Sequence, residues 1–276
     1  IPVIHVTGTN GKGTFCTKTA LAMQLKGIKT GLFTSPHIST IRERTRVNGE
    51  MISKEFTMNF YDRLLEMGEQ IGETLTYFDY QTVQALAYFK EKKVDAIVLE
   101  VGMGGRLDST NLLPTCLSAV VTDIDLDHTE VLGNTREDIL REKMGIVKRR
   151  TRVVVGPRVP RELAQRMCRS KGSMLYVQEK TYDNYVQEID ALVRLNAETI
   201  QFDLDFVDKV KDVEGAKCMP PCRLQPLELS SPQCTAYLDV GHNPAAIERV
   251  LKTLQDKHSD SKLYLFFGCK PTKDAS

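Results

Sequence analysis

The sequence predicts an α/β fold: a doubly wound, mostly parallel sheet with a phosphate-binding loop, followed by the start of a second, truncated α/β domain. Short apolar runs alternate with amphipathic segments along most of the chain, which is the pattern of parallel strands joined by crossover helices. The runs at 94–100 and 117–124 are almost continuously apolar, as in strands buried on both faces. A glycine-rich turn joins the first apolar run to the first amphipathic segment, as in loops that wrap phosphates.

That turn is Gly8-Thr9-Asn10-Gly11-Lys12-Gly13-Thr14, between a strand at 1–6 and a helix that runs to Lys26. Its glycines let backbone N–H groups converge on anionic oxygens, and the positive end of the helix points to the same place. Lys12 can reach the β- and γ-phosphates, and the Thr14 hydroxyl can hold Mg²⁺. Gly13 makes the match to G-x-x-x-x-G-K-[ST] imperfect, and the alternative is an ordinary glycine-rich turn. We predict that the chain binds a nucleoside triphosphate.

The composition is that of an ordinary globular chain: 276 residues, 41% hydrophobic and 26% charged, with a formal net charge of +1. This balance gives no general reason to expect nucleic acid or a membrane surface as partner, and no apolar run approaches the ~20 residues that span a bilayer. The seven cysteines lack framework spacing, which suits a reducing compartment, and we expect free thiols rather than zinc at 218–234. We expect a cytoplasmic monomer, with an upstream targeting segment and a mitochondrial pool left open.

A second strand, at 28–34, ends in Ser35-Pro36-His37 and is followed by a polar, basic stretch at 42–50. Two interpretations of this stretch stay open: a solvated loop with charge pairs, and a mobile loop whose arginines meet an anionic substrate. Asn48-Gly49 marks a turn within it. Ser53 is a favoured N-cap for the next helix.

Another helix is expected over 79–93. The segment Thr76-Tyr77-Phe78-Asp79 brings aromatic side chains to its start. Judged by the residue pattern, such aromatics more often pack into a core than form a platform for a ligand.

Charged side chains follow the two most apolar strands. Glu100 closes the run at 94–100, at the edge where open α/β sheets bind ligands. There it can hold Mg²⁺ directly or through water, the alternative being a solvated strand end. The glycine-rich segment 101–108 brings backbone close to the same place. Asp127 and His128 follow the run at 117–124, and a histidine beside carboxylates at a strand end is a candidate for binding metal or phosphate.

The remaining patterns predict further elements and a second domain. Helices are expected at 135–148, 160–170 and 245–257, and strands at 152–155, 174–177, 235–240 and 263–267. The pattern weakens between 178 and 219, where 196–210 is a candidate helix whose buried face is not identified. Pro220-Pro221 is a natural hinge, and we place the domains at 1–222 and 223–276.

Six segments, in order, make the chain resemble the folylpolyglutamate synthase and dihydrofolate synthase family of the Mur ligase superfamily. They are Val6 to Thr14, Thr34-Ser35-Pro36-His37, Leu99 to Asp108, Leu126-Asp127-His128-Thr129, Glu142-Lys143-Met144-Gly145-Ile146 and Leu238 to Pro244. The family has a glycine between the lysine and the hydroxyl residue, which accounts for Gly13. Compared with the family, the chain lacks a helix before the first strand and a full second domain, and the region 177–196 is short.

The resemblance implies roles for particular residues. Gly11, Lys12, Gly13 and Thr14 hold the ATP phosphates, and Asn196, Arg223 and Asp239 hold the nucleotide across the domain interface, although Cys222 stands where the family has glycine. Ser35, Glu100 and His128 match magnesium ligands. Lys143, which by pattern alone is an exposed helical lysine, matches a lysine carried as an N6-carboxylate beside the metal. Thr76, Tyr77, Phe78, Asp79 and Leu107 match the pocket for the pterin side of the substrate.

The chemistry implied by the resemblance is ATP-driven amide formation. A carboxylate of reduced folate or dihydropteroate takes the γ-phosphoryl group, and the amine of L-glutamate attacks the acyl phosphate. The catalytic residues would be Lys12, Lys143 and His128, and the cofactors ATP and Mg²⁺. Two alternatives stay open: a truncated member that binds nucleotide without catalysis, and a Mur-type ligase with another substrate.

Overall fold

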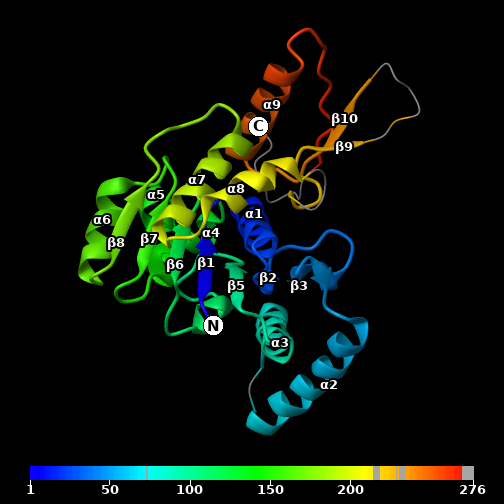
Figure 1. Cartoon of the computed structure of the whole chain (residues 1–276), viewed down its shortest axis with the longest axis vertical. Helices are drawn as coiled ribbons and strands as arrows, with labels where there is room; N and C mark the ends of the chain where they lie inside the picture. Colours follow the sequence, from blue (N-terminus) through cyan, green and yellow to red (C-terminus); the bar gives the residue numbers. More distant parts are fainter. Residues whose placement is uncertain (73, 214–217, 228, 230–233, 269–276) are drawn as a thin grey trace.

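The computed structural model describes residues 1–72, 74–213, 218–227, 229 and 234–268. Its main feature is a sheet with strand order β4-β3-β2-β5-β1-β6-β7-β8 and helices on both faces (Figure 1). The strands are β1 Val3–Thr7, β2 Thr30–Phe33, β3 Thr45–Val47, β4 Glu50–Met51, β5 Ala96–Glu100, β6 Ser118–Val121, β7 Arg152–Val155 and β8 Met174–Val177. The helices are α1 Lys12–Leu25, α2 Lys54–Ile71, α3 Tyr77–Glu91, α4 Thr129–Leu132, α5 Arg136–Lys143, α6 Arg161–Ser170, α7 Tyr185–Thr199, α8 Leu204–Lys209 and α9 Pro244–Lys257. Short 3-10 turns are η1 Ile41–Arg44, η2 Ser109–Leu112, η3 Met144–Ile146 and η4 Val210–Asp212.

Strand β1 lies at the point where the strand order reverses. It pairs in parallel with β5 on one side and β6 on the other, so that Val6 lies opposite both Glu100 and Val120. The chain then places β2 beyond β5 and β7 and β8 beyond β6. The loops that follow β1, β5 and β6 therefore meet at one edge, which is where open α/β sheets bind ligands. The predicted doubly wound α/β fold is confirmed.

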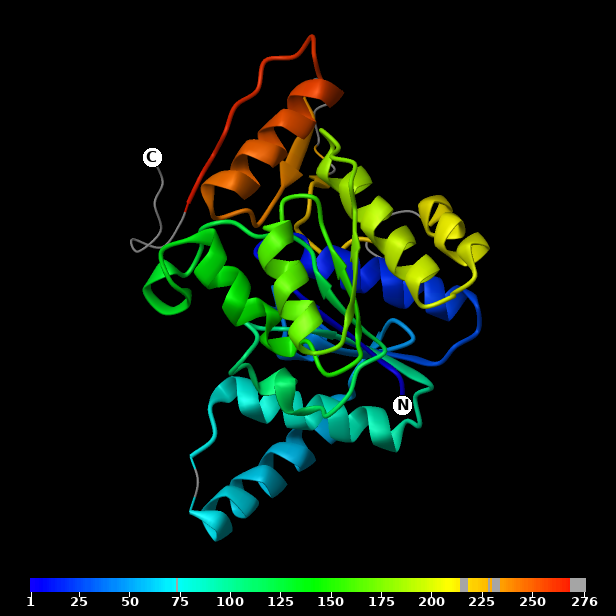
Figure 2. The ribbon, with the colours of Figure 1, turned by 90° about the vertical axis from the view of Figure 1, so that its left-hand side faces the viewer.

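Helices cover the two faces of the sheet separately (Figure 2). On one face, α1, α7 and α8 pack on apolar side chains of β1, β5, β6 and β7. On the other face, α5 and α6 pack over β6 and β7, and α3 packs over β2 and β5. Because both faces are covered, the central strands are buried along their length, which explains their continuous apolar sequence.

The polar stretch at 42–50 is not the loop that the sequence suggested. It forms the 3-10 turn η1 and the antiparallel pair β3–β4, and β3 in turn pairs antiparallel with β2, so the stretch extends the sheet. Asn48 and Gly49 carry the hairpin turn with φ of 49° and 82°, which confirms the predicted Asn-Gly turn. Backbone pairing with β2 is the reason why this polar segment is ordered.

The region where the sequence pattern weakened contains two helices with different bounds from those expected. The expected helix 196–210 was wrong, because α7 begins at Tyr185 and ends at Thr199, and α8 begins at Leu204. Asn184 starts α7 by accepting the N–H groups of Val186 and Gln187. The buried face of α7 has a helical spacing and includes three polar residues. Its buried residues are Glu188, Ile189, Leu192, Val193, Asn196, Ala197 and Thr199.

The bounds of the helices α2, α3 and α5 differ less from those that the sequence predicted. Ser53 caps α2 as predicted, by accepting the N–H of Phe56, and α3 starts at Tyr77 because Thr76 and Asp79 form a capping box. The helix expected over 135–148 ends at Lys143 and continues as η3.

The C-terminal part holds an antiparallel pair, β9 Gln225–Leu227 and β10 Ala236–Leu238, before α9. The strand predicted at 263–267 was wrong: among the described residues, 262–268 form no strand, and Phe266 is almost fully exposed, so this apolar run has no sheet neighbour to pack on. None of the described helices is long and apolar enough to cross a membrane. The boundary between domains at 222 and 223 stays a prediction.

Candidate active site

The glycine-rich loop after β1 is held tightly against the end of β6. The Thr9 N–H donates to the Asp123 carbonyl at 2.9 Å, and the Thr122 hydroxyl donates to the Asn10 carbonyl at 2.6 Å. A Cβ on Gly8 would lie 2.0 Å from Thr122 Oγ1, so only glycine fits there. Gly11 starts α1 with a φ of 85°, a conformation that also favours glycine.

Two lysines converge on this loop. Lys12 Nζ donates to the carbonyl oxygens of Gly8 at 2.9 Å and Thr9 at 3.2 Å. Lys143 Nζ, from the last turn of α5, donates to the same Gly8 oxygen at 3.0 Å. Lys143 is 4% exposed, so the expectation of an exposed helical lysine, based on pattern alone, was wrong. Burial and the positive charge of Lys12 lower the pKa of Lys143 from 10.5 to about 7, against the attraction of Asp127 and other carboxylates.

Glu100 ends β5 inside the protein. It is 2% exposed, and its Oε2 accepts the Ser35 backbone N–H at 3.0 Å. Burial raises the pKa of Glu100 to about 7, although Lys12, the Ser35 hydrogen bond and two arginines oppose the rise. A buried carboxylate beside a serine, at the edge where phosphates would lie, is a hard-oxygen donor set that fits a magnesium ion.

Gly13 leaves space beside this carboxylate. A Cβ at Gly13 would lie 3.6 Å from Glu100 Oε2 and from Pro220 Cγ, which is ordinary contact. A cavity of about 520 Å³ starts at Gly13, Ser35 and Glu100 and extends to the β3–β4 hairpin, where Arg46 lines it. The stretch 42–50 thus borders a cavity as an ordered hairpin, and contact of its arginines with an anionic substrate stays a prediction.

His128 lies after β6, at the same edge of the sheet. It precedes α4 with a left-handed backbone at φ 51°, and its Nδ1 lies 3.8 Å from Glu130 Oε1. The neighbouring Asp127 accepts a hydrogen bond from Asn243 at 3.3 Å. The placement of His128 around a metal together with Ser35 and Glu100 stays a prediction.

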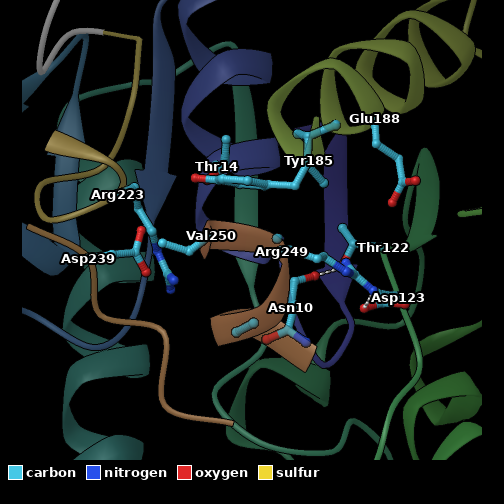
Figure 3. A pocket seen from close by; sticks show the side chains of 13 residues that line it. Asn10, Thr14, Thr122, Asp123, Tyr185, Glu188, Arg223, Asp239, Arg249 and Val250 are labelled. Atoms are coloured by element: carbon cyan, nitrogen blue, oxygen red, sulfur yellow. Dashed lines mark hydrogen bonds and ion pairs between the residues drawn. The ribbon is translucent and has the colours of Figure 1, made fainter. Parts of the chain in front are cut away.

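A second pocket lies between the phosphate loop, α7 and α9 (Figure 3). Arg223 and Asp239 line it opposite Asn10 and Thr14, so the structure brings these predicted residues together. The Asp239 carboxylate accepts the N–H groups of Leu224 at 2.9 Å and Gly241 at 2.7 Å, which fixes its direction.

Two more residues bear on the predicted nucleotide contacts. Cys222 has a φ of 55°, a left-handed conformation, which gives a physical reason why the family has glycine there. Asn196 lies elsewhere: it is buried in α7, accepts a hydrogen bond from Ser118 on β6 at 2.8 Å, and is not among the residues that line this pocket.

Four of the predicted pterin-side residues, 76–79, lie at the start of α3, and the fifth, Leu107, lies in the segment between β5 and η2. Asp79 accepts from Thr76, which caps the helix, and from the Ser109 hydroxyl. Phe78 packs with its ring 5.8 Å from that of Phe33 and fills the space beside Gly102, where a Cβ would lie 2.6 Å from its ring.

The other two pterin-side residues differ from Phe78 in exposure. Tyr77 is exposed, so the core interpretation holds for Phe78 but not for Tyr77, and Leu107 is 80% exposed. The Arg44 guanidinium lies within 6.0 Å of the ring centroids of Tyr77 and Phe78, so a cation borders these two aromatic side chains.

Several lining residues were missed by the sequence reasoning. Thr122 and Asp123 follow β6 directly, and their place after a buried strand could have indicated them. Arg249 and Tyr185 carry no such signal, since each is an ordinary helical residue until α9 and α7 are placed beside the loop. Burial raises the pKa of Tyr185 to about 12, so it is a neutral phenol in this pocket.

Comparison with known proteins agrees with this geometry. The Mur ligase middle domain family matches residues 6–187. The chain is similar to dihydrofolate synthase/folylpolyglutamate synthase of Haemophilus influenzae, with 40% identity over 72% of this chain and 43% of that protein. It is also similar to the Buchnera aphidicola (Acyrthosiphon pisum strain) protein of the same name, with 30% identity over 99% of this chain and 70% of that protein.

Among solved structures, a bifunctional folylpolyglutamate synthase/dihydrofolate synthase with Mn, AMPPNP and L-glutamate bound superposes with a TM-score of 0.78 and 30% identity. The match covers 92% of this chain and 66% of that one. The chain spans less than half the length of several curated relatives that it matches, 43% and 40% for two bacterial proteins and 24% for a third from Dictyostelium discoideum. These matches cover most of this chain, and the chain belongs to the dihydrofolate synthase/folylpolyglutamate synthase family, with a Mur ligase middle domain.

Proposed function

We propose that this chain binds ATP and Mg²⁺ and joins L-glutamate to a carboxylate of reduced folate or dihydropteroate, with ADP and phosphate as products. The observation that carries the proposal is the meeting of Lys12, Lys143 and the buried Glu100 around the glycine-rich loop. The solved relative with Mn, AMPPNP and L-glutamate supports the same three ligand classes.

The phosphate loop supplies position and positive charge. Lys12 donates to two neutral carbonyls of its own loop, and an anionic phosphate oxygen is a stronger acceptor than either. Lys12 and the loop N–H groups would then neutralise charge on the transferred γ-phosphoryl group. Glu100, Ser35 and His128 would hold Mg²⁺, which supplies further charge neutralisation when bound. Arg223 and Asp239 would hold the nucleoside in the second pocket.

The carboxylate of the pterin substrate then attacks the γ-phosphorus, and ADP leaves. Phosphorylation converts an unreactive carboxylate into an acyl phosphate, and the amine of L-glutamate displaces phosphate from that carbonyl carbon. Phe78, with Thr76, Tyr77, Asp79 and Leu107, would bind the pterin side, because an aromatic ring beside the Arg44 cation suits a flat heterocycle.

Lys143 is proposed to carry a carbamate. Carbamate formation needs a neutral amine, CO₂ and the loss of a proton, and burial brings the pKa of Lys143 to about 7, where half of the amines are neutral. The negative carbamate would then support the metal site, whereas a bare ammonium would repel the cation.

A turnover assay tests the function. The chain is incubated with ATP, Mg²⁺ and L-glutamate, with either dihydropteroate or tetrahydrofolate, and ADP is quantified against the glutamylated product. We expect one ADP for each amide bond and no ADP when the pterin substrate is omitted. Nucleotide binding without turnover on either substrate would instead support the inactive nucleotide-binding alternative.

A further inference from the structure

Helix α9 begins directly against the phosphate loop. Asn243, which is 4% exposed, caps α9 through its Oδ1, which accepts the Ala246 N–H at 2.9 Å. Its Nδ2 donates to Asn10 Oδ1 at 3.0 Å and to Asp127 Oδ2 at 3.3 Å. Asn10 donates back to Asn243 Oδ1 at 3.4 Å, so the two amides bind each other reciprocally.

A second contact from α9 reaches the same region. Arg249 donates to Asp123 Oδ2 at 2.9 Å, and the two side chains face each other in the pocket of Figure 3. The Asp123 carbonyl in turn accepts the N–H of Thr9 in the phosphate loop. Helix α9 is thus tied both to the phosphate loop and to the segment after β6, two segments far from it in sequence.

The start of α9 also fixes the pocket residues that precede it. Asp239 lies four residues before Asn243, and its carboxylate is bound to the backbone of Leu224 and Gly241. Movement of Asn243 relative to Asn10 would therefore carry Asp239 and the neighbouring Arg223 with it.

We propose that Asn243 is a positioning residue that couples occupation of the phosphate loop to the docking of α9 over the nucleotide. The inference rests on the proposed nucleotide binding. A nucleotide that orders the loop favours the position of Asn10 that Asn243 binds, and docked α9 favours the occupied loop in return, since coupling between two sites is reciprocal.

Asparagine suits this role because one amide both donates and accepts. An aspartate at 243 would keep the helix cap but place a second carboxylate against Asp127, where like charges repel. Asn243→Asp therefore separates docking from helix formation. Asn10→Ala removes the partner amide while leaving the cap of α9 untouched, so it controls for misfolding of α9 itself.

Hydrogen exchange with mass spectrometry, with and without the ATP analogue AMPPNP and Mg²⁺, tests the coupling. In the unaltered chain we expect AMPPNP to slow exchange both in peptides from 8–25 and in peptides from 244–257. In Asn243→Asp and in Asn10→Ala, the analogue should still slow exchange at 8–25 but no longer at 244–257. Asn184→Asp, which alters the cap of α7 in the same way, is the matched control and should behave as the unaltered chain.

The affinity for AMPPNP provides the second readout. Coupling energies between sites correspond to ~5- to 150-fold in affinity, so the dissociation constant of AMPPNP should rise within that range in each single variant. The loss in the double variant should be less than additive, because the two changes share the contact between Asn10 and Asn243. Full protection of 244–257 by AMPPNP in Asn243→Asp, or additive losses in the double variant, would overturn the proposal. Absence of AMPPNP protection at 8–25 in the unaltered chain would instead overturn the proposed nucleotide binding.

Discussion

Lys12 and Lys143 reach one carbonyl oxygen of Gly8 from separate elements, one at the start of α1 and the other at the end of α5. Two ammonium groups this close repel each other, and the buried one gives up its proton more readily. Glu100 shows the opposite response, because burial favours its protonated form. The pKa values of Lys143 and Glu100 are therefore set by their surroundings more than by their residue type.

Substitution of Lys12 should remove catalysis without unfolding the chain. Lys12 is the first residue of α1, and its Nζ donates to backbone carbonyls of the preceding loop, so Lys12→Ala should abolish ATP turnover while the melting temperature changes little. Steady-state ADP release and thermal unfolding are measured together. Lys54→Ala, on exposed α2, is the control and should retain activity. Near-normal turnover by Lys12→Ala would show that the loop does not bind phosphate as proposed.

Glu100→Gln keeps the side chain's shape and removes its charge. If Glu100 holds Mg²⁺, the Mg²⁺ concentration for half-maximal turnover should rise strongly in this variant. In the unaltered chain the same concentration should rise as pH falls through about 7, since protons then compete for the carboxylate. Magnesium titrations at several pH values check both points, and identical titrations for the two proteins would contradict a metal role.

Lys143 gives a prediction with a defined pH direction. Its pKa is lowered to about 7, so the neutral amine predominates above pH 7 and is lost as pH falls below it. Carbamate occupancy and activity should therefore decline at acidic pH and in bicarbonate-free buffer. Lys143→Ala should lose activity, and acetate should restore part of it by filling the vacated anionic position. A fully active Lys143→Ala enzyme would refute the carbamate.

At the scale of elements, the sequence pattern predicted the central strands and the helix caps well. It predicted poorly the helices whose buried faces include polar residues. The runs that became β5 and β6 were recognisable because both faces of the sheet are covered. Helix α7 was misplaced because three of its buried residues, Glu188, Asn196 and Thr199, are polar and interrupt the apolar periodicity. The site residues after β1, β5 and β6 could be predicted from strand ends, whereas Arg249 needs the tertiary position of α9.

The start of α7 can be tested directly. Asn184 accepts two N–H groups of the first turn, so Asn184→Ala should lower the free energy of unfolding by about 0.5–2 kcal/mol, the usual cost of losing an N-cap. Asn184→Asp should cost much less, because aspartate caps about as well. Urea denaturation of the three proteins provides the comparison. Equal stability of the alanine variant would show that α7 does not need this cap.

At the scale of the whole molecule, the pocket proposed to hold the nucleotide is lined by residues from both the N-terminal and the C-terminal parts of the chain. Asn10, Thr14, Arg223, Asp239 and Arg249 all line it, so a nucleotide there would bridge segments that are far apart in sequence. Ligands that bind only the folded state stabilise it by mass action. The stability of the C-terminal part should therefore depend on nucleotide more than that of the sheet.

Thermal unfolding with ADP tests this bridging. At about 100 times its dissociation constant, ADP should add roughly 2.7 kcal/mol to the stability of the unaltered chain and raise its melting temperature. Arg223→Ala should bind ADP more weakly and show a smaller rise at the same concentration. Each rise is measured relative to the melting temperature of the same protein without ADP. Equal rises in the two proteins would show that Arg223 does not contribute to ADP binding.

The β3–β4 hairpin has a consequence beyond the site. An outermost strand exposes unpaired backbone groups that can recruit a strand from a neighbouring molecule, and proteins limit this with short, charged edges. Here β4 is only the two residues Glu50–Met51, and Glu50 is exposed. The hairpin that lines the cavity beside Glu100 therefore also shortens that edge of the sheet, and gives the chain protection there against edge-to-edge aggregation.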